Sequence, residues 1–336
     1  MLFKRIPKDI RYKGIANILI IGLSSIGDNL LISPAIKLLK DTYKDACFDI
    51  VVGPRAVDFA KGNPAFSNIY VWDKKTGISN LVRMLKDKKY DIVVDFRNSI
   101  IPFFIKTKYR MTFFKEEFFS RKFFTHESER TMKFFEPYFG RPAKIELYFP
   151  LSNQEISEYR DFFMNTNILT PGRRVITITP GAAFEKKRWD KEKFAKVAAL
   201  VVSQFDVNIV ISGNNKEYNL AEEIKIMINN DRAFNLAGKI TFRQLAYILS
   251  QSSLLITNDT GTMHLSSAMK CPVVVIFGPG NPLRYGPIGT KNFVLHTKRS
   301  CFPCKVESKC KKGFVCMEDV SVEDVMMAVS MILQAS

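Results

Sequence analysis

Residues 254–265 read LLITNDTGTMHL, a pattern that predicts a strand, a tight turn and the start of a helix. In a parallel α/β sheet such a turn lies at the carboxyl end of the strand, where ligands bind. The backbone N–H groups and the dipole of the helix that begins there favour a phosphate. In a simpler interpretation Asp259 and Thr260 cap the helix, and His264 is a helical residue bonded to a nearby carbonyl.

The composition is that of a globular protein with an excess of positive charge. Of the 336 residues 46% are hydrophobic and 25% charged, which suits about two domains with apolar cores. The formal net charge of +17 indicates an anionic partner: nucleic acid, an acidic lipid surface or a phosphorylated substrate. No apolar run approaches the roughly 20 residues of a membrane span, and the basic start lacks the apolar core of a secretory signal. We therefore expect a cytoplasmic protein.

Strand and helix patterns alternate along the chain, which predicts α/β domains of the doubly wound type. The Pro-Gly pair within residues 169–174 is the best linker candidate. We therefore predict a first domain at 1–170, a second at 171–320 and a closing helix within 321–336. Predicted strands are 16–22, 48–53, 69–72 and 91–96, then 175–179, 207–212, 254–256 and 273–278. Predicted helices include 74–89, 153–165, 191–203 and 322–333.

A glycine-containing loop at residues 23–28 joins the first predicted strand to a helix. It has neither a GxGxxG pattern nor a P-loop lysine, and Asp28 places a negative charge where a phosphate would lie. A carboxylate at this position suits a general base. Alternatively, Asp28 caps the helix or interacts favourably with its dipole, and the loop alone does not decide between these roles.

Residues 100–144 form an insertion in which phenylalanine pairs alternate with basic residues. This insertion could grip an amphiphilic anion or rest on anionic lipid, as the overall charge favours. The ordinary alternative is a helical excursion whose phenylalanines pack inward. Single-stranded nucleic acid would also suit such a pattern, but no RNA-binding signature accompanies it, so nucleic acid is not expected. The pairs are Phe103-Phe104, Phe113-Phe114, Phe118-Phe119, Phe123-Phe124 and Phe134-Phe135.

Four loops that follow predicted strands of the second domain carry glycines, cations and carboxylates. Lys187 and helix N-termini could hold a phosphate there, and a carboxylate such as Glu217 could hold a ribose.

Several motifs resemble, in order, those of the heptosyltransferases of glycosyltransferase family 9, which build the inner core of lipopolysaccharide. The opening motif is SSIGDNLLISPA at 24–35, and TPGA at 179–182 is followed by KRW at 187–189. NLAG at 235–238, DTGTMH at 259–264, FGP at 277–279 and the closing cysteines complete the series.

The resemblance implies a GT-B architecture: two Rossmann-like domains that face across a cleft, with the acceptor on the first and the nucleotide-sugar on the second. The helix at 321–336 would return to the first domain. The implied reaction is inverting, metal-independent transfer of heptose from ADP-heptose to Kdo-lipid A or a heptosylated core, with no cofactor. The expected partner is this anionic acceptor, met by peripheral contact with the anionic inner face of the inner membrane, and we expect a monomer.

The resemblance also implies roles for single residues. Asp28 matches the catalytic base of the family, and Lys187 matches the lysine that pairs with the donor phosphate. Glu217 would bind the ribose, on the looser match SGNNKE. Further donor contacts are expected at Thr179, Gly181, Ala182, Asp259, Thr260, Gly261 and His264. Acceptor contacts are expected at Ser25, Gly27, Arg55, Lys122 and Arg130.

Six cysteines add one more candidate site. Cys301, Cys304, Cys310 and Cys316 have spacings that a zinc site could use, although only one CxxC pair is present. Free thiols packed in a loop are the equal alternative, and a disulfide is less expected in the cytoplasm. The isolated Cys47 and Cys271 are predicted core residues.

Two other functions are compatible with the sequence. One is a GT-B enzyme that uses another nucleotide-sugar or acceptor, or an epimerase. The other is a non-enzymatic binder of anionic lipid, nucleotide or nucleic acid, whose binding would depend on salt without turnover. The combination of Asp28, Lys187 and Asp259 argues against a pure binder.

Overall fold

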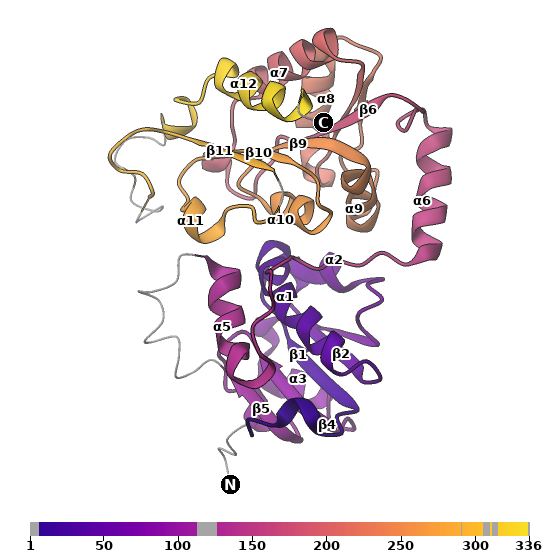
Figure 1. Ribbon diagram of the computed structural model, residues 1–336, viewed down its shortest axis with the longest axis vertical. Coiled ribbons are helices and arrows are strands. Elements are labelled where there is room, and N and C mark those ends of the chain that lie inside the picture. The colour runs from indigo at the N-terminus through magenta and orange to yellow at the C-terminus, as the bar shows by residue number, and fades with distance from the viewer. Residues whose placement is uncertain (1–6, 113–125, 290, 305–309, 311–314, 335–336) are drawn as a thin grey trace. The chain divides into compact units, whose positions relative to one another are not determined.

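The structure, a computed structural model, describes residues 7–112, 126–289, 291–304, 310 and 315–334. The chain forms two compact units, Met1–Pro150 and Leu151–Ser336, hereafter the first and second units. Each unit contains one parallel β-sheet with helices packed on it (Figure 1). The predicted fold class, two Rossmann-like α/β domains, is therefore confirmed.

The sheet of the first unit has five strands in the order β3-β2-β1-β4-β5. β1 pairs in parallel with β2 on one side and with β4 on the other. Its last four residues are buried, as expected for a central strand covered on both faces. The chain switches sides of the sheet between β1 and β4, so the loop after β1 lies where such sheets bind ligands. The strands are β1 (Asn17–Ile21), β2 (Cys47–Val52), β3 (Asn68–Val71), β4 (Tyr90–Asp95) and β5 (Thr107–Thr112).

The helices of the first unit surround this sheet. The predicted helix at 74–89 is a 3-10 turn followed by a short helix, because Gly77 between them has a φ of 79° that no α-helix continues. The α-helices are α1 (Ile26–Thr42), α2 (Val57–Ala60), α3 (Ile78–Met84) and α5 (Glu127–Phe139). The 3-10 turns are η1 (Ile10–Tyr12), η2 (Pro54–Ala56), η3 (Lys74–Thr76) and η4 (Ile101–Phe104).

The second sheet has six strands in the order β11-β10-β9-β6-β7-β8. Alternate residues of its strands bury into two cores: Ile176 packs with α7, α8 and α12 on one face, and Val175 with α6 and α9 on the other. The switch of sides lies between β6 and β9. The strands are β6 (Arg174–Thr179), β7 (Val207–Ile211), β8 (Ala233–Asn235), β9 (Ser252–Asn258), β10 (Val273–Phe277) and β11 (Asn292–His296).

Side-chain caps mark where several helices of the second unit begin. Capping boxes open α6 at Ser152, α9 at Thr241 and α12 at Ser321. Within the described part of the chain, no helix is long and apolar enough to cross a membrane. The α-helices are α6 (Asn153–Asn165), α7 (Lys191–Gln204), α8 (Tyr218–Ile228), α9 (Phe242–Gln251), α10 (Gly261–Ala268), α11 (Pro282–Tyr285) and α12 (Val322–Leu333). The 3-10 turns are η5 (Glu185–Lys187), η6 (Asn215–Glu217) and η8 (Val315–Met317).

The division of the chain differs from the one predicted at residue 170. The units separate after Pro150, because α6 packs on α9 of the second unit and Phe163 stacks on Tyr247 with ring centroids 6.0 Å apart. The closing helix also differs from the expectation that it returns to the first domain. α12 belongs to the second unit, where it packs on α7 and buries Val325 and Ile332 in the core.

The described part of the Phe-rich insertion packs inward on α5 but not at Phe104. Phe134 and Phe135 of α5 are buried, and Phe135 stacks on Phe96 at 5.9 Å between ring centroids. Phe104, by contrast, is 55% exposed. The ordinary interpretation therefore holds for the pair on α5. The three other pairs, Phe113-Phe114, Phe118-Phe119 and Phe123-Phe124, lie outside the described residues.

The two isolated cysteines differ in burial. Cys271 is buried as predicted, and burial raises the pKa of its thiol well above the ordinary value. Cys47 is exposed, contrary to the prediction that it is a core residue. The physical reason is its place as the first residue of β2, at the end of the strand rather than inside the sheet.

A buried ion pair fastens α6 to α9. Arg243 donates hydrogen bonds to both carboxylate oxygens of Glu155. Burial alone would raise the pKa of Glu155, but the hydrogen bonds from Arg243 and Ser152 outweigh it and lower this pKa to about 2.

Replacing Glu155 by glutamine is expected to lower the free energy of unfolding of the second unit by about 3 kcal/mol at pH 7, because Arg243 keeps its buried charge without a counter-charge. A depressed carboxyl pKa stabilises the fold above the ordinary value of 4.5, and this contribution is lost as the pH falls towards 2. Urea unfolding of wild type and Glu155→Gln between pH 7 and pH 3 should therefore show a difference that shrinks below about pH 4.5. A difference independent of pH would contradict this account.

Candidate active site

The loop between β1 and α1 presents the Asp28 carboxylate at the carboxyl edge of the first sheet. Ser25 is the N-cap of α1: its Oγ accepts a hydrogen bond from the Asp28 N–H at 3.1 Å and donates one to Asp28 Oδ2 at 2.7 Å. None of the described residues donates a hydrogen bond to Oδ1, and the side chain is half-buried. One carboxylate oxygen is thus fixed, while the other is open to a proton donor.

The position of Asp28 in α1 limits the structural roles that its carboxylate can have. The helix cap is Ser25, so the carboxylate of Asp28 is not needed to cap α1. Asp28 does lie in the first turn, where its charge interacts favourably with the helix dipole. The interaction with the helix dipole is therefore the structural role that the geometry leaves to Asp28.

Asn29 fixes the backbone of the same loop by side-chain hydrogen bonds. Its side chain is fully buried, with Oδ1 accepting from the Leu23 N–H at 2.9 Å. Its Nδ2 donates to the carbonyls of Leu23 at 3.0 Å and Ser25 at 2.6 Å. These bonds fix the backbone that carries the cap, a function that the sequence analysis did not assign to Asn29.

The other expected acceptor residues occupy different parts of the first unit. Gly27 lies in the first turn of α1, and Arg55 is exposed in η2, directly after β2. Arg130 on α5 is mostly buried and forms an ion pair with Glu127, so an anion would have to compete with that carboxylate. Lys122 lies outside the described residues. The structure therefore brings Ser25, Gly27 and Asp28 together at the start of α1. Arg130 is engaged in its ion pair with Glu127.

In the second unit, Lys187 and Asp259 meet at the switch point of the sheet. Lys187 ends η5 after β6, Asp259 follows β9, and Nζ lies 2.7 Å from Oδ2. The two side chains are only 18% and 13% exposed, so water screens the pair weakly. The pair places a cation beside the N-terminus of α10.

The start of α10 has no side-chain cap. Thr260 is its N-cap residue but makes no cap hydrogen bond, and Asp259 is engaged with Lys187. The capping interpretation of these two residues is therefore wrong. Gly261 begins the helix, while His264 is buried within it.

Asn258, the last residue of β9, joins the end of this strand to the connection between β6 and α7. Its fully buried side chain accepts a hydrogen bond from the Trp189 N–H at 3.0 Å and donates one to the Pro180 carbonyl at 2.7 Å. No sequence motif assigns this function to Asn258. An amide directly after an apolar strand was the available signal, since a buried amide must find partners on neighbouring loops.

Two further expected donor residues serve the loop after β6. Thr179 is buried, and its hydroxyl lies 2.7 Å from that of Ser212. The carbonyl of Ala182 accepts hydrogen bonds from Nε and Nη2 of Arg188 at 3.1 and 3.0 Å. Both residues therefore stabilise the conformation of this loop through hydrogen bonds.

Glu217 lies against the backbone of Gly181. Its Oε2 accepts a hydrogen bond from the Asn214 N–H at 2.9 Å. A Cβ built at Gly181 would lie 2.0 Å from Oε1, which no real structure allows. The carboxylate and the glycine loop therefore share one small space.

Gly181→Ala is expected to displace the Glu217 carboxylate. If that carboxylate holds the ribose of ADP, as the resemblance implies, the substitution weakens the binding of ADP about tenfold. The fold should lose little stability, because the displaced atoms are the far end of a flexible side chain. Isothermal titration with ADP measures the effect. Gly14→Ala is the matched control, since its Cβ would meet nothing within 4 Å. Equal ADP affinity in both variants would contradict the expectation.

The four clustered cysteines do not form a metal site in the structure. Cys301, Cys304, Cys310 and Cys316 form no disulfide. Burial raises the pKa of the Cys316 thiol, and the neighbouring thiols act in the same direction. Among the described residues, these four included, no group of three or more histidines, cysteines or acidic residues is placed to hold a metal ion. The zinc site therefore stays a prediction from the spacing of the cysteines.

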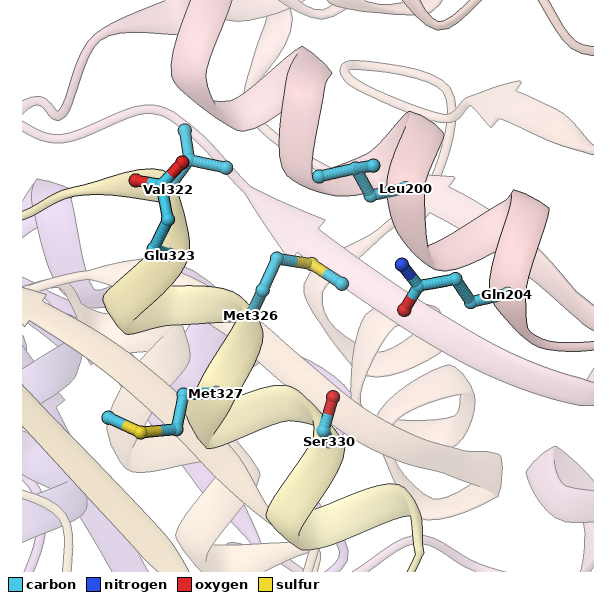
Figure 2. Close-up of a pocket in the computed structure, with 7 residues that line it drawn as sticks. All are labelled: Leu200, Gln204, Val322, Glu323, Met326, Met327 and Ser330. Atoms are coloured by element: carbon cyan, nitrogen blue, oxygen red, sulfur yellow. The ribbon is translucent and has the colours of Figure 1, made fainter.

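A shallow cavity of about 230 Å³ lies away from all these loops. Figure 2 shows it between α7 and α12, with methionine and leucine side chains around it. Its one ionisable lining residue is Glu323, so it offers little with which to hold a nucleotide-sugar. The lining residues are Leu200, Gln204, Val322, Glu323, Met326, Met327 and Ser330.

Two Rossmann-like units, each with polar groups at the switch point of a parallel sheet where ligands bind, are the parts of which a GT-B fold consists. The sequence profile of "Glycosyltransferase family 9 (heptosyltransferase)" matches residues 78–314, and the chain belongs to this family. It is therefore a glycosyltransferase.

Individual relatives agree with this assignment. Lipooligosaccharide heptosyltransferase 2 of Campylobacter jejuni is 29% identical over 317 residues, which cover 89% of this chain and 93% of that protein. A family 9 glycosyltransferase of Veillonella parvula superposes with a TM-score of 0.78 at 22% identity, covering 96% and 98% of the two chains. The ADP-heptose LPS heptosyltransferase II of Escherichia coli gives 0.75 at 20% identity, with 95% and 99% covered.

Proposed function

We propose that this protein transfers a heptose from ADP-heptose to the inner core of lipopolysaccharide, with inversion at the anomeric carbon and without a metal ion. Membership of the heptosyltransferase family supports the sugar. The name of the Campylobacter jejuni relative includes lipooligosaccharide, and that of the Escherichia coli enzyme includes ADP-heptose. The observation that carries the mechanism is the Asp28 carboxylate, with one oxygen held by Ser25 and the other open.

Asp28 acts as the general base of the proposed reaction. It takes the proton of the acceptor hydroxyl as that oxygen attacks the anomeric carbon of the heptose. The hydrogen bond from Ser25 orients the carboxylate, so the proton goes to the open oxygen. Attack from the face opposite the diphosphate gives an inverted product.

The second unit stabilises the leaving group. As the anomeric carbon–oxygen bond breaks, negative charge develops on the diphosphate of ADP. Lys187 and the N–H groups at the uncapped start of α10 are the positive groups proposed to receive it. Asp259, which holds Lys187 before the donor arrives, would then turn to the sugar hydroxyls. Glu217 beside Gly181 is proposed to hold the ribose.

The proposed acceptor is Kdo-lipid A or a heptosylated core, whose carboxylates and phosphates suit a net charge of +17. Such an acceptor is presented at the cytoplasmic face of the inner membrane. We therefore propose peripheral contact with that anionic surface, by a monomer.

The test is ADP release from ADP-heptose by the wild-type protein, with and without Kdo-lipid A or a heptosylated core. Release should require the acceptor, and NMR of the product should show an anomeric configuration opposite to that of the donor. ADP-glucose and a UDP-sugar serve as control donors. Turnover with a control donor but not with ADP-heptose would leave the family assignment intact and reject the heptose. Retained configuration would reject the single-displacement mechanism.

A further inference from the structure

We infer that Arg97 is a positioning residue for the transfer reaction: its guanidinium sets the backbone of the loop that carries Asp28. This inference rests on the proposed role of Asp28 as general base. It concerns a residue that no sequence motif singled out, and all of its contacts lie within the first unit.

The side chain of Arg97 reaches from the end of β4 to the loop after β1. Nε donates a hydrogen bond to the Gly22 carbonyl, and Nη2 donates a longer one to the Leu23 carbonyl at 3.5 Å. Gly22 and Leu23 lie three and two residues before Ser25, the cap of α1. Asn29 binds Leu23 from the other direction, so the loop is held from both sides.

The same guanidinium lies against two more strand ends. It is centred 5.4 Å from the ring of Trp72, which follows β3. Its Nη2 lies 3.4 Å from the position that a Cβ of Gly53, after β2, would occupy. Arg97 thus contacts the ends of β1, β2, β3 and β4, the four strands around the proposed base.

The backbone turn that carries Arg97 is itself held by hydrogen bonds. Oδ1 of the fully buried Asp95 accepts a hydrogen bond from the Arg97 N–H at 2.9 Å. Its Oδ2 accepts from the N–H and the hydroxyl of Ser99 at 2.7 and 2.9 Å. This hydrogen-bonded turn therefore directs the guanidinium at the loop. Burial lowers the pKa of Arg97, and the nearby Asp95 carboxylate offsets part of that effect.

An arginine suits this task because its planar group offers several N–H donors in a fixed arrangement. Glutamine at this position would leave the Gly22 carbonyl without its side-chain donor and the Leu23 carbonyl with the bond from Asn29 alone. The loop would relax, and Ser25 would carry Asp28 away from the position that proton transfer needs. A displacement of about 1 Å in such a group can cost roughly a hundredfold in rate.

The test compares Arg97→Gln, Arg97→Lys and the matched control Arg110→Gln. Arg110 on β5 also donates to two backbone carbonyls, those of Pro102 and Ile105, but not to the loop of Asp28. We expect Arg97→Gln to lower kcat between tenfold and a hundredfold with an unchanged Kd for ADP. Lysine should restore part of the loss, and Arg110→Gln should stay within twofold of wild type.

A double-mutant cycle separates positioning from mere stability. If Arg97 acts through Asp28, Arg97→Gln should cost less than twofold in the Asp28→Asn background. Hydrogen–deuterium exchange of residues 22–29 should also become faster in Arg97→Gln. Residues 252–258 of the second unit serve as the reference, so that a change confined to 22–29 is distinguished from a general loss of stability.

Three results would overturn the inference: kcat of Arg97→Gln within twofold of wild type, the same loss in both Asp28 backgrounds, or an equal loss in Arg110→Gln. Failure of the proposed function would look different. In that case the wild-type protein itself would release no ADP with any core acceptor, or Asp28→Asn would turn over at the wild-type rate.

Discussion

Replacing Asp28 by asparagine is expected to lower kcat about a hundredfold to ten-thousandfold, the usual range for loss of a general base. Asparagine has the same shape, and its amide oxygen can still accept the hydrogen bond from Ser25. It cannot take up the acceptor proton. The affinity for ADP should stay at the wild-type value, because the residues proposed to bind the donor belong to the second unit. Initial rates of ADP release and calorimetric titration of ADP measure the two quantities.

Asp58→Asn is the matched control for this prediction. Asp58 is an exposed acidic residue in the first turn of α2, so both substitutions remove a charge that interacts with a helix dipole. Only the change at Asp28 should reduce kcat. Should the two variants lose stability equally and keep full activity, Asp28 would have the dipole role alone.

Replacing Lys187 by methionine is expected to lower kcat/KM about a hundredfold to a thousandfold, as loss of one group that stabilises a developing anion does. Methionine keeps much of the side-chain volume and removes the charge. The Kd for ADP should rise at least tenfold, because the diphosphate loses its cation. Lys187→Arg should restore part of the affinity.

The ion pair with Asp259 offers a competing explanation, in which Lys187 only holds two loops together. Lys191→Met is the control, because Lys191 also pairs with a carboxylate, Glu223, in the same unit but at an exposed place. A purely structural Lys187 would show a lower melting temperature with unchanged affinity for ADP. That result would remove Lys187 from the proposed donor site.

The sequence determined most of the regular structure, because hydrophobic periodicity and helix caps depend on neighbouring residues. The helices predicted at 153–165 and 322–333 coincide with α6 and α12, and the predicted central strands fall within a residue or two of the observed ones. The edge strands β5, β8 and β11 escaped prediction. β8 has three residues only, and β5 and β11 each pair on one side and have a less buried pattern. An apolar run is a signal of burial, and edge strands are only partly buried.

The sequence also located the chemical groups, but the tertiary structure decided how they are held. Asp28, Lys187 and Asp259 stand out in the chain by their motifs. The pairing of Lys187 with Asp259, the joining of loops by Asn258 and the reach of Arg97 to Gly22 link residues far apart in sequence. The same holds for the division after Pro150, which depends on the packing of α6 against α9. Local patterns specify the strands and helices, whereas a hydrogen bond between two loops exists only after the sheet has brought their strand ends together.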